Sequence, residues 1–345
     1  MRVTLQPRRL FSILIVGCLL AVWLSLASGP VSLPLMDTLR AGLRLLGWPV
    51  AGDDLQQAEL ILGQIRVPRT LLGLAVGAVL ALSGVAMQGL FRNPLADPGL
   101  VGVSSGAALG AAVAIVAGAS IGGLPEAIAP YLLSISAFGG GLLVTAIVYR
   151  LGRRDGQTSV GIMLLAGVAM TALAGSIIGL FSYLADDATL RTLTFWNLGT
   201  LNGASYARVW PLLLVCVLVI LWLPRRARAL NALLLGESEA RHLGIEVERL
   251  KRELVLCIAL GVGAAVAAAG LIGFVGLIVP HLVRLLAGSD HRVVLPASAL
   301  AGASLLLFAD VFARLVLAPA ELPIGIVTAF IGAPFFLFLL VRGRP

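Results

Sequence analysis

The sequence predicts an all-α, polytopic membrane protein with about ten transmembrane helices and both termini in the cytoplasm. Hydrophobic residues make up 59% of the 345 positions, charged residues only 12%, and the mean hydropathy is +1.02. A soluble domain is roughly half apolar and about a quarter charged, and it could not cover its core with so few charges. The apolar stretches are solid runs, not ~10-residue segments of alternating polarity, which argues against a transmembrane β-barrel.

Ten apolar runs are each expected to form one helix. A spanning helix needs about 20 predominantly apolar residues, so the third and eighth runs are short. The first run follows Arg2, Arg8 and Arg9 and resembles a signal peptide. No A-x-A cleavage site is evident after it, and we expect it to be retained as the first helix. The runs cover residues 11–26, 68–90, 99–118, 127–149, 159–184, 209–223, 253–272, 274–288, 293–312 and 323–341.

Small residues and prolines suggest how these helices meet. The chain has 40 glycines and 17 prolines. Small faces, such as residues 261–270, let helices approach closely where no hydrophobic force drives them together. Short helices broken near residues 270–280 suit a transporter, although tight packing alone also explains them. Kinks or interruptions are predicted at Pro211, Pro280, Pro296 and Pro334.

The basic residues encode topology. A net charge of +8 and a pI near 10.4 would suggest nucleic-acid binding in a soluble chain. Here most basic residues lie at the ends of apolar runs, and alternating sides from the N-terminus puts 18 of the 25 on one face. That excess belongs in the cytoplasm. The cytoplasmic set is Arg2, Arg8, Arg9, Arg92, Arg150, Arg153, Arg154, Arg225, Arg226, Arg228, Arg241, Arg249, Lys251, Arg252, Arg284, Arg292, Arg342 and Arg344; the outer set is Arg40, Arg44, Arg66, Arg69, Arg191, Arg208 and Arg314.

Signals for catalysis are weak, and we predict no catalytic residue and no metal site. A P-loop needs Gly-Lys followed by Ser or Thr, but the only lysine, Lys251, follows a leucine. Gly102-Val-Ser104-Ser-Gly106 fits G-x-S-x-G, and His281 is available as a base. An intramembrane serine protease is therefore a distant alternative, although the motif needs a strand-to-helix turn.

The three cysteines are expected to be buried thiols. Cys18, Cys216 and Cys257 each lie inside an apolar run and have no CxxC spacing. Disulfides and metal ligands are therefore disfavoured.

The longest polar stretch, residues 224–253, is predicted to hold a helix of about two turns between Gly236 and Gly244. Glu237 and Glu239 lie in its first turn, where the helix dipole favours acids. Two interpretations stay open from these residues: a solvated loop helix, or an amphipathic helix that sits in a groove of a cytoplasmic partner. The apolar stripe behind the second interpretation consists of Leu233, Leu234, Ala240 and Leu243.

Two further polar features lie between the runs. Asn93-Pro94 and Asp97-Pro98-Gly predict a structural turn on the cytoplasmic side. On the outer side, arginines at a membrane edge often only snorkel, but three on a face that should be poor in them fit a docking site for carboxylates. These three are Arg66, Arg69 and Arg314.

Together these features resemble the permeases of type II ABC importers, which import iron–siderophore chelates, haem and cobalamin. The resemblance covers nearly the whole chain in the same order, and its 93–106 stretch is most similar to the haem permeases. It implies a single transmembrane permease domain over residues 1–345, with a coupling loop at about 224–253. The segments that carry it are Arg66-Val-Pro-Arg69-Thr, 84–99, 102–107, 273–284 and 321–334.

The resemblance also implies partners. It implies a homodimer in the bacterial inner membrane, two cytoplasmic ATPase subunits that hold ATP and magnesium, and a periplasmic binding protein. Acidic residues on the two lobes of that protein would pair with Arg66, Arg69 and Arg314, and this chain itself would hold no cofactor. The coupling helix that docks into the ATPase would comprise Gly236, Glu237, Ser238, Glu239, Ala240, Arg241, His242, Leu243 and Gly244.

The runner-up is a secondary transporter or channel, which should show ionisable residues within its spans. Only Asp310, His281 and Arg284 lie there, all near span ends, which argues against ion coupling. The expected cargo is haem, with a ferric siderophore or cobalamin next. Arg191 or Arg208 at the outer mouth would meet haem propionates, or would instead pair with the acids at 186 and 187.

Overall fold

The structure is a computed structural model that describes residues 5–29, 31, 33–48, 55–120, 129–154 and 156–342. Within these ranges the chain is almost wholly helical, apart from one short β-hairpin. In chain order the elements are α1 (Pro7–Ala27), α2 (Leu35–Leu45), α3 (Gln56–Leu60), η1 (Ile61–Arg66), α4 (Val67–Leu90), η2 (Pro98–Val101), α5 (Val103–Ser120), α6 (Ala129–Gly152), β1 (Arg153–Arg154), β2 (Gln157–Thr158), α7 (Val160–Leu184), α8 (Asp187–Asn197), α9 (Tyr206–Trp222), η3 (Leu223–Arg226), α10 (Ala227–Leu235), α11 (Glu237–His242), α12 (Val247–Ala269), α13 (Val275–Ala287), α14 (His291–Leu315) and α15 (Ile324–Arg342).

Each of the ten predicted apolar runs overlaps one helix, which confirms the all-α membrane fold. Within the described residues, seven helices are long and apolar enough to cross a membrane: α1, α4 with its extension, α6, α7, α9, α12 and α14. The other three, α5, α13 and α15, are apolar but shorter in the described part of the chain. The third and eighth runs are short as predicted, and the tenth is short as well. The number that cross the membrane stays a prediction.

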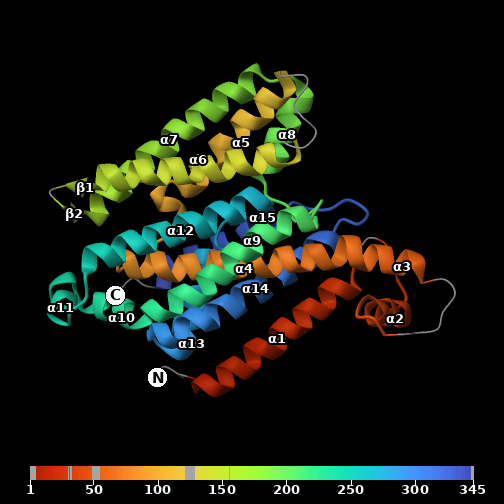
Figure 1. The fold of residues 1–345 in the computed structure, drawn as a ribbon, viewed down its shortest axis with the longest axis horizontal. Helices are drawn as coiled ribbons and strands as arrows, with labels where there is room; N and C mark the ends of the chain where they lie inside the picture. Colours follow the sequence, from red (N-terminus) through yellow and green to blue (C-terminus); the bar gives the residue numbers. More distant parts are fainter. Residues whose placement is uncertain are drawn as a thin grey trace.

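Helix α4 is the centre of the molecule. Figure 1 shows α9, α12 and α14 beside it, a group formed by α5 to α8 on one side and α1 on the other. In the most apolar 18-residue stretch of α4, 89% of residues are buried, against 11% for α7. A helix that is apolar all round is stable only when other helices or lipid cover it. Helix α4 is therefore covered by protein, whereas α7 leaves most of its apolar side chains at the surface.

Glycines allow the central helices to touch. A Cβ on Gly77 of α4 would collide with the carbonyl of Gly302 on α14, and a Cβ on Gly302 would collide with the carbonyl of Gly77. This mutual contact confirms that small residues let backbones approach closely.

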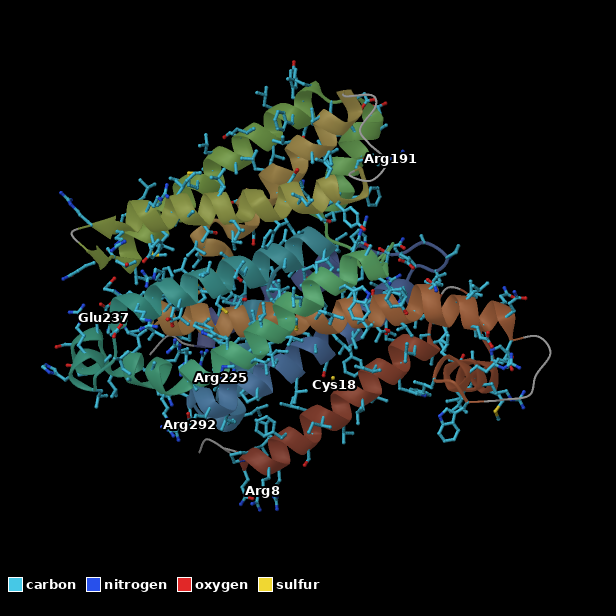
Figure 2. All side chains as sticks on the ribbon, in the orientation of Figure 1. Arg8, Cys18, Arg191, Arg225, Glu237 and Arg292 are labelled. Atoms are coloured by element: carbon cyan, nitrogen blue, oxygen red, sulfur yellow. The ribbon has the colours of Figure 1, made fainter. Side chains whose placement is uncertain are left out.

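The two ends of the bundle differ in character. Figure 1 places α10, α11, α13, the β-hairpin and the start of α1 at one end, and α2, α3 and α8 at the other. Arg8, Arg225 and Arg292 lie toward the same end as Glu237, whereas Arg191 lies toward the opposite end (Figure 2). This sorting agrees with the side assignment made from the charges.

Of the two predictions about chain breaks, the one at the prolines needs correction and the other is confirmed. Pro211, Pro280 and Pro296 lie inside continuous helices, as does Pro334, so none of them interrupts a helix. The break predicted near residues 270–280 is confirmed: it lies between α12 and α13, where Gly270 and Phe274 both have positive φ, 72° and 68°.

All three cysteines are free. Cys216 and Cys257 are buried as predicted, but Cys18 is only half-buried because much of α1 is exposed.

Candidate functional site

Helix α11 protrudes at the predicted cytoplasmic end, between the two glycines that the sequence singled out. Gly236 has φ 133° and Gly244 has φ 80°, both in the region that favours glycine. The amide of Gly244 donates to the carbonyl of Arg241 at 2.9 Å, and the amide of Ile245 donates to that of Ala240 at 3.0 Å. These bonds satisfy the last carbonyls of the helix, as αL C-caps do.

The predicted apolar stripe is wrong. Leu233 and Ala240 are buried, but Leu234 and Leu243 are 43% and 62% exposed. The chain turns sharply at Gly236, so α10 and α11 are separate helices and helical spacing does not continue from one to the other. The predicted coupling residues instead divide by exposure. Ala240 and Gly236 face inward, Glu237 is half-buried, and the exposed members are Ser238, Glu239, Arg241, His242, Leu243 and Gly244.

Helix α10 is tied to the start of α14 through Asn231. Its amide nitrogen donates to Asp290 Oδ1 at 2.7 Å, and its oxygen accepts from the backbone amide of His291 at 2.9 Å. The hydrogen bond from the backbone amide of Arg292, and then the one from Asn231, hold the pKa of Asp290 below its ordinary value. The base of α11 is thus fixed to α14.

A second tie involves the only lysine, whose role the sequence did not indicate. Lys251 of α12 is 2% exposed. Its ammonium donates to Glu237 at the start of α11 at 2.8 Å, to Glu248 at 3.2 Å, and to the carbonyl of Thr158 at 2.8 Å. The only indication in the sequence was a single lysine among many arginines, and the contacts of Lys251 depend on tertiary structure.

The turn that follows α4 matches its prediction. The side chain of Asn93 accepts a hydrogen bond from the amide of Leu95 at 2.9 Å, and that of Asp97 accepts from Gly99 at 2.8 Å. Pro94 lies within the turn, and Pro98 begins η2. Burial raises the pKa of Asp97, and the hydrogen bond from Gly99 works in the opposite direction.

The outer arginines are buried. Arg66 is 3% exposed and donates to the carbonyls of Leu26 and Ala27 at 2.7 and 2.8 Å, and to that of Val31 at 2.7 Å. It therefore holds the end of α1, and the segment that follows it, against the start of α4.

Arg69 and Arg314 share the carboxylate of Asp310, which is 1% exposed. Arg69 approaches Asp310 at 2.8 Å and Glu321 at 2.9 Å, while Arg314 lies 3.0 Å from Asp310. Arg314 also donates to the carbonyl of Ser28 at 3.0 Å. We refer to Arg66, Arg69, Arg314, Asp310 and Glu321 as the outer charge cluster.

This geometry does not present the three arginines as an exposed surface, and their docking role stays a prediction. Docking of a partner's carboxylates requires exposed guanidinium groups, but Arg66, Arg69 and Arg314 are 3%, 6% and 2% exposed. The N–H groups of these guanidiniums donate to carbonyls and carboxylates of the chain itself. In this conformation they join α1, α4 and α14.

The two arginines assigned to the outer mouth, Arg191 and Arg208, are exposed, and only Arg208 lies beside a cavity. Within the described residues, neither Arg191 nor Arg208 forms an ion pair, and Asp186 instead caps α8 by accepting from Thr189 at 3.0 Å. Arg208 lines a cavity of about 530 Å³ between α6, α9 and α12, whose other walls are largely apolar, and Arg191 does not.

The serine motif has no catalytic geometry. Ser105 Oγ donates to the carbonyl of Gly102 at 3.1 Å and lies 3.1 Å from the hydroxyl of Thr171. His281 on α13 contacts the ring of Phe335, and its buried Nε2 has no hydrogen-bond partner among the described residues. No serine–histidine pair is formed within that part of the chain.

Comparison with known proteins assigns the chain to a family. The model of the FecCD transport family matches residues 17–342. The chain belongs to the FecCD transport family. The hemin transport system permease protein HmuU of Yersinia pestis is 44% identical over 98% of this chain and 97% of its own length. The vitamin B12 import system permease protein BtuC of Escherichia coli is 45% identical over 93% and 95%.

A solved structure described as an inward-facing conformation of a metal-chelate type ABC transporter matches this FecCD-family chain with a TM-score of 0.83. It is 32% identical and covers 98% of this chain and all of its own. The FecCD-family chain is therefore a multi-pass membrane transport permease. This membership replaces the secondary-transporter and protease alternatives.

Proposed function

We propose that this permease is the membrane subunit of an ATP-driven importer that carries an iron chelate, with haem as the first candidate, from the periplasm to the cytoplasm. The observation that carries the proposal is α11: an exposed, glycine-framed helix at the predicted cytoplasmic end of a chain that aligns along 98% of its length with a hemin permease. A ferric siderophore or cobalamin is the next candidate cargo.

The energy for transport comes from a partner. The sequence has no Gly-Lys-Ser/Thr, so a P-loop cannot form in this chain. A partner can drive a conformational change only if it binds the two states with different affinity. The proposed assembly holds two copies of this chain, two cytoplasmic ATPase subunits with ATP and magnesium, and a periplasmic binding protein, in a bacterial inner membrane.

The exposed part of α11 suits a groove in the ATPase. Leu243 is 62% exposed and Leu235 is 68% exposed, and they flank the polar residues Ser238, Glu239 and His242. Short amphipathic helices bind grooves through a few apolar anchors. Because the outer charge cluster is buried, docking of the binding protein through its guanidinium groups is not part of the proposal.

Leu243→Ser tests this contact. The side chain is exposed, so the fold should tolerate the change, whereas loss of an interface anchor should weaken ATPase binding on the order of tenfold. Affinity of the purified permease for the ATPase in detergent is the measurement. Leu184→Ser is the matched control: Leu184 is 71% exposed and is the last residue of α7, away from α11, so this variant should bind the ATPase normally. Equal affinity of both variants and the parent protein would contradict the assignment of α11.

Cargo is tested separately. Permease, ATPase and binding protein are reconstituted in vesicles, and ATP-dependent uptake of haem, a ferric siderophore and cobalamin is compared. We expect uptake of haem, and Arg208→Gln should reduce it because an exposed guanidinium beside an apolar cavity suits a propionate. Uptake of cobalamin or the siderophore alone would refute haem as the cargo while leaving the importer intact.

A further inference from the structure

We infer that Lys251 is a positioning residue that ties the coupling helix α11 to Thr158, the residue before the N-cap of α7, so that movement of α11 is passed through the lysine to the start of α7. The inference rests on the proposed coupling role of α11, and it adds the path by which that helix reaches a membrane span.

The lysine is placed as a three-way connector. Its 2% exposed ammonium bonds to one residue from each of three elements: Glu237 of α11 at 2.8 Å, Glu248 of α12 at 3.2 Å and Thr158 of β2 at 2.8 Å. An ammonium has three N–H donors. All three are used, and each goes to a different element.

Helix α12 holds Thr158 from both sides of its peptide backbone. Lys251 donates to the carbonyl of Thr158, and a carboxylate oxygen of Glu248 accepts from its amide at 2.8 Å. Two side chains of α12 thus replace a neighbouring strand for β2. The other edge of β2 pairs with β1, where Thr158 lies opposite Arg153.

The held residue stands directly before α7. Ser159 follows Thr158 and is the N-cap of α7, and its own amide donates to the carbonyl of Gly152 at the end of α6 at 2.9 Å. Figure 1 shows α11 and the β-hairpin at the same end of the molecule, and the start of α12 contacts both elements. Glu237 lies at that end in Figure 2.

Charge makes the connection stiff. Glu237 and Glu248 converge on one cation, and their side chains are 28% and 33% exposed. Charge-assisted hydrogen bonds are roughly twice as strong as neutral ones. Without the lysine, two carboxylates would face each other across a largely buried site, and they would repel. In the most apolar stretch of α7 only 11% of residues are buried, and α7 packs against α5 and α6 but not against α11.

The test uses the assembled importer with and without a non-hydrolysable ATP analogue. Amide hydrogen exchange of residues 156–164 reports on the tie, and transport per ATP hydrolysed reports on coupling. Lys251→Met keeps the length of the side chain and removes its charge and donors. It should accelerate exchange at 156–164, abolish the effect of nucleotide there, and lower transport per ATP about tenfold, within the usual range of coupling between sites.

Three further variants separate positioning from general destabilisation. Lys251→Arg restores charge and donors and should recover both readouts. Glu237→Ala removes the acceptor of only the branch to α11; it should leave basal exchange of the hairpin unchanged while lowering its response to nucleotide. Arg249→Met is the matched control, because Arg249 lies on the same helix, 3.0 Å from Glu253, with 58% of its side chain exposed. It should behave as the parent protein.

The outcomes are distinct. If Lys251→Met retains nucleotide-dependent exchange at 156–164, or if Lys251→Arg fails to recover it, the positioning role of Lys251 is overturned. If nucleotide leaves the exchange of α11 unchanged in the parent protein, the proposed coupling function fails instead. That result would be seen without any variant.

Discussion

The outer charge cluster makes a quantitative prediction for Arg69→Met. The substitution removes the contacts to Asp310 at 2.8 Å and to Glu321 at 2.9 Å. Asp310 is 1% exposed, so its carboxylate would depend on Arg314 alone. Removing one partner of a buried ion pair costs about 3–5 kcal/mol, because it leaves an uncompensated charge. Since Arg314 still neutralises Asp310, we expect about 3 kcal/mol, at the lower end of that range.

Thermal unfolding of the purified permease in detergent is the assay. At roughly 2 °C per kcal/mol, the lower end of the range for domains of 150–250 residues, the unfolding temperature should fall by about 6 °C. Arg249→Met removes an exposed ion pair, for which losses of about 0–1 kcal/mol are usual. Its shift should therefore be small.

A double variant tests the reasoning further. Adding Glu321→Gln to Arg69→Met removes the unpaired carboxylate and leaves Asp310 with Arg314, so part of the lost stability should return. If Arg69→Met shifts the unfolding temperature no more than Arg249→Met does, the energetic argument from burial is refuted. These measurements must precede any docking assay of Arg69 variants, because a destabilised permease also binds partners poorly.

Other predictions concern packing and pH. Gly77→Ala should destabilise the fold by about 1–3 kcal/mol through overpacking against Gly302. Gly179→Ala, which has open space around it, should be neutral or slightly stabilising. Equal unfolding temperatures for the two variants would exclude close contact of α4 with α14. The pKa of Asp290 is lowered in the folded state, so the native protein binds fewer protons there than the unfolded chain. Its contribution to stability is present above about pH 4, the ordinary value for aspartate, and is lost as pH falls through the lowered pKa. The unfolding temperature of Asp290→Asn should therefore lie below that of the parent protein at pH 7 and approach it in acid; a constant difference across that range would contradict the shift.

Local features were predictable because they depend on neighbours in the chain. The bounds of α11 follow from two glycines with positive φ: Gly236 ends α10, and Gly244 ends the turn that closes α11. The turn at Asn93 to Pro98 follows from side chains that bond amides two residues on. The apolar stripe across Gly236 failed for the same reason, since a helical period has no meaning across a break in the helix.

Contacts between distant segments were not predictable. Arg69 meets Asp310 and Glu321, which lie 241 and 252 positions away, and Lys251 meets Thr158 at a separation of 93. Nothing near these residues in the sequence indicates such partners. The sequence around an arginine at a membrane edge is the same whether its side chain is exposed to a docking protein or buried among carboxylates.

The lengths of the apolar runs determined the helical membrane fold, and the bias of basic residues toward one side predicted which end faces the cytoplasm, because a bilayer acts on each segment separately. Packing determined which charges are buried, which of them pair, and which helix carries the link between α11 and α7. A buried ammonium or guanidinium is tolerated only where several acceptors converge on it, and convergence exists only once the helices have come together.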